Sequence, residues 1–364
     1  SSEIKTHSVM ENVIRQCIGI DCGMKEHVAS FSRMYADLRV EYVSTLTIPN
    51  GPGGFVKLSK WIRKLMDPSM PCQFVLEATG VYHETLACFL TEKGWPVSVV
   101  LPNRAKYFSK TLTVKTVNDK VSSQTLAAMG LEKKLDVWSP PDPIYNQLRQ
   151  LTRERDQLKA ESTQIKCQLH AEESGAWPNK SSIKRMNQRL SLIERQVEEV
   201  ETSIREVVAE SPEIDQAVRR MTSIVGVGML TAVTVLAETN GFNLVRNKKQ
   251  LVSYAGLDVV ERTSGISVRG RSRISHRGNR YLRKCLYFPA MTAARHSNDH
   301  KALYNRLISK HGIAMKAAVA VQRKLLVMMY AIWKNGTIYD PNYESKKQQN
   351  ELGQTRRPAL TELA

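Results

Sequence analysis

The chain has 364 residues, with 53 Lys or Arg against 35 Asp or Glu, so it carries a net charge of +18 at neutral pH. Its 42% hydrophobic content excludes a wholly disordered chain, and no apolar run approaches the ~20 residues of a membrane span, so we expect no membrane partner. Six scattered cysteines without a CxxC pair favour the cytoplasm, and the positive charge points to a polyanion, most often nucleic acid.

Residues 12–138 combine short apolar strands with amphipathic helices. We expect strands at 17–21, 27–31, 40–48, 74–77 and 97–101, and helices at 55–65, 82–94 and 119–131. Three strands, a helix, and then alternating strands and helices is the element order of an RNase H-like α/β fold. The first and fourth strands are neighbours in that fold.

Three acids stand at the ends of these elements. Asp21 ends the first strand, Glu77 ends the fourth, and Asp119 begins the helix at 119–131. In an RNase H-like fold these side chains would converge, and gathered carboxylates repel one another unless a hard cation bridges them. The pattern therefore predicts a site for Mg²⁺, with two ions activating the attacking oxygen and stabilising the leaving oxygen in phosphoryl transfer.

Residues 139–214 form a predicted helical hairpin. Three prolines between Ser139 and Pro143 predict a hinge in which no helix continues. Two helices follow, and the second carries apolar residues at alternating steps of three and four between Ile183 and Val207, as in a coiled-coil seam. Packing within the chain and a dimerisation arm are equally compatible with this pattern.

Residues 215–340 form a predicted helical domain that holds most of the positive charge. The net charge is +15 here, against +5 for residues 12–138 and −2 for residues 139–214. Gly226 and Gly228 lie before an apolar helix, as in a helix-hairpin-helix whose backbone amides face a phosphate. We expect residues 341–364, which are polar, to be a disordered tail.

A basic loop follows in the same domain. Between residues 262 and 284 there are eight Lys or Arg and no acid, which suits a loop that lies against a phosphate backbone. The candidate nucleic-acid ligands in it are Arg262, Arg269, Arg271, Arg273, Arg277 and Arg280. Ser264, between Thr263 and Gly265, could present a hydroxyl to a ligand, but residue chemistry alone does not favour it over Ser267, Ser272 or Ser275.

These motifs, taken in order, resemble a known family. The chain is similar to the Piv/MooV-type insertion-sequence transposases, which are DNA recombinases guided by a bridge RNA. The resemblance runs from about residue 16 to residue 340 and rests on six segments: Ile18-Gly-Ile-Asp21, Glu77-Ala-Thr-Gly80, Ser223-Ile-Val-Gly-Val-Gly228, Tyr254-Ala-Gly-Leu257, Ser264-Gly-Ile-Ser-Val-Arg-Gly270 and Leu286-Tyr-Phe-Pro-Ala-Met291.

The resemblance implies a RuvC-like domain with an Asp-Glu-Asp-Asp metal site and a transposase domain with a nucleophilic serine. By position, the first three acids fall on Asp21, Glu77 and Asp119, and the serine falls on Ser264. The family's serine attacks a DNA phosphate to give a covalent phosphoserine. Donor and target DNA and a bridge RNA are the implied partners, and a dimer or tetramer is the implied assembly, in which the two domains of one site can come from different subunits.

The chain departs from the family at the fourth acid, which falls on Ser122. A hydroxyl there removes one negative charge from the cation site and is a poor ligand for a hard cation beside a carboxylate. A natural variant that still holds Mg²⁺, a weakened site and a deliberate substitution are all open, and we favour the first because Ser123 and Gln124 also differ from the family pattern.

Three functions follow from these features. The main hypothesis is a recombinase that exchanges DNA strands through Ser264 with Mg²⁺ at Asp21, Glu77 and Asp119. The second is a RuvC-like nuclease or Holliday-junction resolvase, in which water attacks and no protein–DNA adduct forms. The third is a non-catalytic RNA- or DNA-binding protein with a decayed metal site, whose binding depends on salt and not on Mg²⁺.

Overall fold

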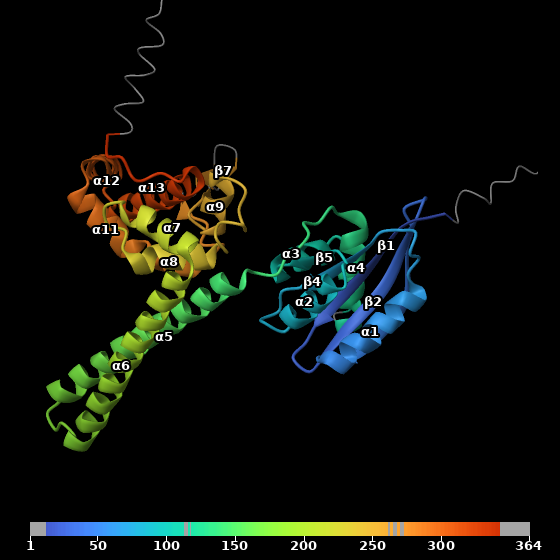
Figure 1. The fold of residues 1–364 in the computed structure, drawn as a ribbon, viewed down its shortest axis with the longest axis horizontal. Helices are drawn as coiled ribbons and strands as arrows, with labels where there is room; N and C mark the ends of the chain where they lie inside the picture. The colour runs from blue at the N-terminus through green and yellow to red at the C-terminus, as the bar shows by residue number, and fades with distance from the viewer. Residues whose placement is uncertain are drawn as a thin grey trace, which may run out of the picture. The chain divides into compact units, whose positions relative to one another are not determined.

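The computed structural model describes residues 12–112, 116, 118–260, 263–264, 268–269 and 273–342, with the backbone alone at 263–264 and 268–269. Its contacts divide the chain between Pro140 and Pro141 into two compact units, drawn from blue to green and from green to red in Figure 1. This division falls within the predicted proline hinge. Most of the expected tail, residues 343–364, lies outside the described residues.

The first unit is built on a five-stranded sheet with the order β3-β2-β1-β4-β5. Antiparallel pairing joins the first three strands, and β4 and β5 continue from β1 in parallel. The sheet therefore has the predicted element order, with β1 and β4 as neighbours. The strands are β1 (Val13–Cys22), β2 (Glu26–Tyr35), β3 (Val40–Pro49), β4 (Cys72–Glu77) and β5 (Val97–Val100).

Two hydrophobic cores cover the two faces of this sheet. Ile18 and Ile20 of β1 pack in one core with residues of α1 (Pro52–Leu65) and α2 (Glu84–Glu92). Cys17 of β1 and Val75 of β4 belong to the other core, with α3 (Pro102–Ser109) and α4 (Asp119–Glu132). The sequence did not predict α3, whose Pro102 occupies the first helical turn, where its missing N–H costs no hydrogen bond.

The second unit begins with two long helices, α5 (Pro143–Ser174) and α6 (Lys180–Glu210), which pack along each other (Figure 1). The apolar residues predicted for the seam are buried between them, among them Leu190, Ile193 and Val197. As expected, no helix runs through the proline hinge, and α5 begins at its last proline, Pro143. It stands in the first turn of α5, where Asp142 caps the free amide of Ile144.

The rest of the second unit is a helical body around one large core. Its helices are α7 (Pro212–Thr222), α8 (Met229–Glu238), α9 (Lys248–Tyr254), α10 (Arg280–Cys285), α11 (Tyr287–His296), α12 (Asn298–His311) and α13 (Ala314–Asn335). Between α9 and α10 the expected loop contains two short antiparallel ladders. β6 (Val259–Val260) pairs with β9 (Arg273–Ile274), and β7 (Thr263–Ser264) pairs with β8 (Val268–Arg269).

No helix in the described ranges is both long enough and apolar enough to cross a membrane. This agrees with the absence of long apolar runs in the sequence. All six cysteines are unpaired in the structure. The stability of the two units therefore depends on their cores and hydrogen bonds, without covalent cross-links.

Candidate functional site

The register of the sheet brings Asp21 and Glu77 to one place. Ile20 of β1 lies opposite Leu76 of β4, so the next residue on each strand, Asp21 and Glu77, stand side by side at the same end of two parallel strands. Side chains alternate between the faces of a strand, so Asp21 shares the face of Cys17 and Glu77 shares the face of Val75. That is the face covered by α4, which begins with Asp119.

Small residues allow α4 to lie directly on β1. A side chain at Gly19 would meet the backbone oxygen of Ser123 at 2.0 Å, and one at Gly130 would meet the sulfur of Cys17 at 2.4 Å. The buried Ser123 hydroxyl donates to the backbone oxygen of Lys120 at 2.8 Å and so accepts from Ser30 of β2 at 2.7 Å. These contacts fix the first turn of α4 at the end of β1.

The three acids act on one another electrostatically. The pKa of Asp21 is raised from 3.8 to about 6, first by burial and then by the negative charges of Asp119 and Glu77. A hydrogen bond from the Ser122 side chain and one from the backbone of Cys22 lower this pKa and so favour the ionised carboxylate. Asp119 and Glu77 are thus near enough to act on Asp21, and Ser122 forms a hydrogen bond with Asp21 from the position of the family's fourth acid. That the three acids together form a metal site stays a prediction.

The donor set suits a hard divalent cation, because two neighbouring acids disfavour the anionic form of Asp21, and such an ion neutralises gathered carboxylates. No three acidic, His or Cys side chains in the described ranges lie close enough together to enclose an ion as they stand. The residues that would hold it are Asp21, Glu77 and Asp119. Ser122 offers a hydrogen bond in this place and no negative charge.

The basic segment of the second unit carries Ser264 on the inner of its two ladders. Ser264 pairs with Val268, and Thr263 pairs with Arg269. The outer ladder is extended by Ser275, whose amide donates to the backbone oxygen of Asp258 and whose hydroxyl donates to its carboxylate. The Ser275 hydroxyl therefore has a structural role. This makes Ser275 the weakest of the four serines that could present a hydroxyl to a ligand.

The structure describes the side chains of some arginines in this segment, and only the backbone of another. Arg273, Arg277 and Arg280 are exposed, and Arg280 lies over the ring of Tyr281 at 4.9 Å. Arg269 is placed by its backbone in β8. Arg262 and Arg271, together with Ser267 and Ser272, lie outside the described residues. The exposed guanidinium groups are available to an anion, as the sequence led us to expect.

The two predicted phosphate-binding glycines have different surroundings. Gly226 has a positive φ of 92°, and a side chain there would meet the backbone oxygen of Pro289 at 2.5 Å, so packing against α11 accounts for this glycine. Gly228 stands at the N-cap of α8 with nothing within 4 Å of its missing side chain. Of the two, only Gly228 leaves room for a ligand at a helix N-terminus, and its phosphate contact stays a prediction.

A buried ionic network that the sequence did not predict supports the basic segment. The Glu238 carboxylate of α8 is 2% exposed and accepts two hydrogen bonds from Arg153 of α5, at 2.7 and 2.9 Å. It also accepts from Asn279 at 2.5 Å, and Asn279 in turn caps α10 by accepting from the amides of Tyr281 and Leu282. The sequence gives one sign of this network, because Glu238 is an acid at the end of an otherwise apolar helix.

Comparison with known families follows the two units. Residues 18–172 match the IS110-type DEDD transposase model, and residues 218–305 match the model described as "Transposase IS116/IS110/IS902 family". The chain belongs to the IS110-type DEDD transposases. Its family places it among DNA transposases and recombinases, and the acids Asp21, Glu77 and Asp119 lie within the first matched region.

Individual relatives agree with this assignment. The pilin gene-inverting protein of Moraxella lacunata is 26% identical over 299 residues, which cover 81% of this transposase and 90% of that protein. An uncharacterised 43.6 kDa protein of insertion element IS110 from Streptomyces coelicolor is 26% identical over 120 residues, which cover 33% of this chain and 29% of that protein.

Two solved structures complete the comparison. Thermus thermophilus RuvC in complex with a Holliday junction is 10% identical, with a TM-score of 0.26, over 34% of this transposase and 99% of RuvC. An Aquifex aeolicus member of the Ppx/GppA family is 9% identical, with a TM-score of 0.21, over 94% of this chain and 99% of that one. The RNase H-like assignment of the first unit rests on its own strand order.

Proposed function

We propose that the chain is a recombinase that cleaves and rejoins DNA strands through Ser264, with Mg²⁺, most simply two ions, held by Asp21, Glu77 and Asp119. The observation that carries the proposal is that Asp21 and Glu77 stand side by side at the ends of β1 and β4, where burial, and after it the charges of Asp119 and Glu77, raise the pKa of Asp21 to about 6. If Asp21 served only to end its strand, it would face water, and its pKa would stay near normal.

The carboxylates and the ion have distinct tasks in this scheme. A bound divalent cation would supply charge stabilisation to the phosphate oxygens during phosphoryl transfer. Asp21 would hold such an ion as a carboxylate, and Ser122 favours that ionised form by donating a hydrogen bond. With Ser122 in this position, Asp21 still has a hydrogen-bonding partner in a site of three acids. This supports the interpretation of Ser122 as a natural variant that still holds Mg²⁺.

The serine step conserves the number of phosphodiester bonds. The Ser264 oxygen attacks a DNA phosphorus and loses its proton to a nearby base, while one P–O bond to a deoxyribose oxygen breaks and that oxygen takes up a proton. A deoxyribose hydroxyl of the partner strand then attacks the phosphoserine and releases the serine. Each step exchanges one phosphate ester for another, so no external energy source is needed. The exposed Arg273, Arg277 and Arg280 would hold neighbouring phosphates.

Guidance by a bridge RNA and assembly as a dimer or tetramer complete the proposal. The segment 215–340 carries +15, which suits binding of nucleic acid, and holds no helix that the sequence identifies as a dedicated base reader. An RNA that pairs with donor and target DNA would supply the sequence specificity. The buried seam of α5 and α6 supports the predicted hairpin, and a coiled-coil contact between subunits stays a prediction.

Ser264→Ala tests the nucleophile. We expect wild-type protein incubated with end-labelled donor and target DNA, RNA and Mg²⁺ to give a covalent protein–DNA adduct on a denaturing gel, and Ser264→Ala to give none. The matched control is Ser275→Ala, because the Ser275 hydroxyl is bonded to Asp258 and is not the proposed nucleophile. The control variant should retain the adduct.

The same experiment separates the rival functions. An adduct that persists in Ser264→Ala rules out this serine as the nucleophile. Hydrolysed DNA ends without an adduct in the wild-type protein would favour a RuvC-like nuclease. Tight nucleic-acid binding that is unchanged by EDTA, with neither adduct nor cleavage, would favour a non-catalytic binding protein.

A further inference from the structure

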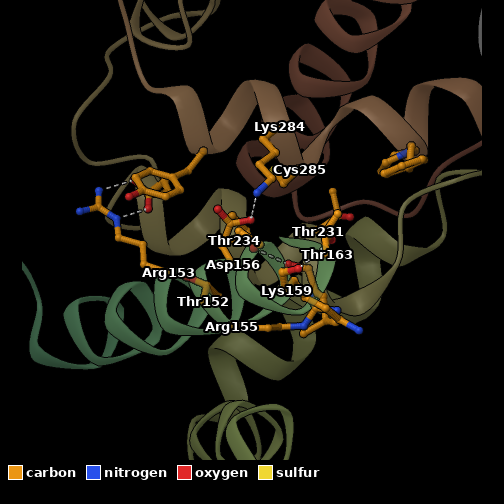
Figure 2. Close-up of a pocket in the computed structure, with 16 residues that line it drawn as sticks. Thr152, Arg153, Arg155, Asp156, Lys159, Thr163, Thr231, Thr234, Lys284 and Cys285 are labelled. Atoms are coloured by element: carbon orange, nitrogen blue, oxygen red, sulfur yellow. Dashed lines mark hydrogen bonds and ion pairs between the residues drawn. The ribbon is translucent and has the colours of Figure 1, made fainter. Parts of the chain in front are cut away.

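A cavity of about 540 Å³ lies within the second unit and is separate from the acids and from Ser264. It is bounded by α5, by α8 and by the segment from α10 to the start of α11 (Figure 2). Its size is in the range of small-molecule sites and matches a single nucleotide. The lining includes Phe288 and Pro289 from the segment Leu286–Met291, for which the proposed reaction gives no role.

The cavity has more positive than negative side chains. Arg153, Arg155, Lys159 and Lys284 line it, against Asp156 and Glu238. Arg153 is paired with the buried Glu238 and Arg155 with Glu201, whereas Lys284 contacts Asp156 in a pair whose side chains are 60% and 32% exposed (Figure 2). A surface pair of this kind contributes little stability, so a phosphate can replace Asp156 as the partner of Lys284 at small cost.

The cavity also offers an aromatic face and hydrogen-bond acceptors. Phe288 is 76% exposed, although phenylalanine is usually buried in folded proteins. The hydroxyls of Thr163 and Thr234 donate to helix carbonyls, so their oxygens are left as acceptors. Cations beside an exposed aromatic ring form the combination with which proteins bind single strands, because the cations hold phosphate and the ring stacks on a base.

We propose that this cavity binds an unpaired nucleotide, whose base stacks on Phe288 and whose phosphate is held by Lys284 and Lys159. The inference rests on the proposed function, in which nucleic acid is the partner of the second unit. The occupant is a nucleotide of either the guide RNA or a DNA strand. Both sources have the same phosphate and an aromatic base, and the 2′-hydroxyl would distinguish them through the threonine oxygens.

Fluorescence of a Phe288→Trp variant tests the stacking. We expect a five-residue oligouridylate or oligodeoxythymidylate to quench the tryptophan emission of this variant until binding is saturated. The quenching should be much stronger than that of the wild-type protein. An abasic oligomer of equal length should not quench it. Tighter binding of oligouridylate identifies an RNA strand as the occupant, and tighter binding of oligodeoxythymidylate identifies a DNA strand.

Affinity measurements supply the matched controls. Phe288→Leu should weaken binding of the same oligomers about 10-fold, a typical loss for one stacked base. Trp177→Leu, at a 92% exposed aromatic outside the cavity, should not weaken it.

Lys159→Gln and Lys284→Gln should each lower the slope of log affinity against log salt by about 0.7. Lys166→Gln, also on α5 but outside the lining, should leave the slope unchanged.

The outcomes separate this inference from the proposed function. If Phe288→Leu, Lys159→Gln and Lys284→Gln bind both oligomers as the wild type does, the cavity is not a nucleotide site, whether or not the serine adduct forms. If they lose binding while Ser264→Ala still forms the adduct, the nucleotide site is upheld and the proposed nucleophile is wrong.

Discussion

Asp21 combines burial, two neighbouring acids and a hydrogen-bonded serine in one side chain. Each of the first two effects penalises its ionised form, and the Ser122 hydrogen bond offsets only part of the penalty. Without a cation, ionised Asp21 therefore destabilises the first unit. A residue that weakens the fold in this way is typical of a functional site and unusual in a structural role.

This gives a prediction about stability and pH. The folded-state pKa of about 6 lies above the ordinary 3.8, so the folded chain binds more protons than the unfolded chain, and the free energy of unfolding falls as the pH rises through 6. Asp21→Asn should raise the free energy of unfolding of the first unit at pH 7.5 by about 1 to 2 kcal/mol, after allowance for solvent screening. Urea unfolding in EDTA measures it.

The pH dependence provides the control for that measurement. Near pH 4 the folded wild-type protein carries a neutral Asp21, so its stability should approach that of Asp21→Asn. Added Mg²⁺ at pH 7.5 should stabilise the wild type and not the variant. Equal stability of the two proteins at both pH values in EDTA would contradict the electrostatic description of this site.

At the scale of elements, Arg153 joins the long helix α5 to the base of the basic segment. Its guanidinium holds Glu238 of α8, lies 4.5 Å from the ring of Tyr281 in α10, and shares Glu238 with Asn279. The Arg153 side chain is 39% exposed, whereas that of Glu238 is 1% exposed, so Glu238 depends on this partner far more than Arg153 does.

Removing Arg153 should therefore destabilise the second unit. We expect Arg153→Met to lower the free energy of unfolding by about 2 to 4 kcal/mol, because it leaves a buried carboxylate without its cation. The double variant Arg153→Met/Glu238→Gln should recover most of the loss.

Arg195→Met is the matched control, since Arg195 and Glu199 form a 3.7 Å pair with side chains 69% and 67% exposed. This variant should change the free energy of unfolding by less than about 0.5 kcal/mol. A loss no larger than the control's would show that Glu238 does not need this partner.

The elements also show which features a sequence can predict. The strands β1 and β4 are predicted by apolar runs that end in acids, the helix α4 is predicted to begin with Asp119, and the strand order follows from the order of the elements. Of the residues that a motif names, Asp21 and Glu77 end neighbouring strands as expected, and their role with Asp119 as a metal site stays a prediction. Local patterns suffice for these features because side-chain alternation and chain order determine them.

Contacts between residues distant in sequence could not be predicted in this way. Arg153 and Glu238 are 85 residues apart, and neither belongs to a recognisable motif. Gly226 has the same local pattern as a phosphate-binding glycine, but its close neighbour is Pro289 of α11. The ladders around Ser264 contain only two residues per strand, too few to produce an alternating pattern.

At the scale of the whole molecule, the acids and the serine belong to different units. Asp21, Glu77 and Asp119 precede the boundary at Pro140, and Ser264 follows it. The segment between Ser139 and Pro143 is rich in proline, and the chain continues directly into α5. In the proposed reaction the acids and the serine would come either from one subunit or from two, and complementation distinguishes these arrangements.

We expect complementation between two inactive variants. Asp21→Asn and Ser264→Ala should each form no adduct alone, but subunits of the two variants mixed before assembly should form it. In a mixed dimer with shared sites, one site combines an intact acid set from one subunit with an intact serine from the other. The adduct should then be on the Asp21→Asn subunit, which a size tag identifies. A mixture that stays inactive would show that each subunit builds its own site.

The 32-residue length of α5 has a mechanical consequence. At a rise of 1.5 Å per residue, Arg153 stands about 15 Å from the start of the helix and about 32 Å from its end at Ser174. The helix is then an unequal lever whose pivot lies beside Glu238 and Asn279. A force applied at its far tip by any bound macromolecule would reach the other end of the helix, at Pro143, roughly doubled and with half the displacement.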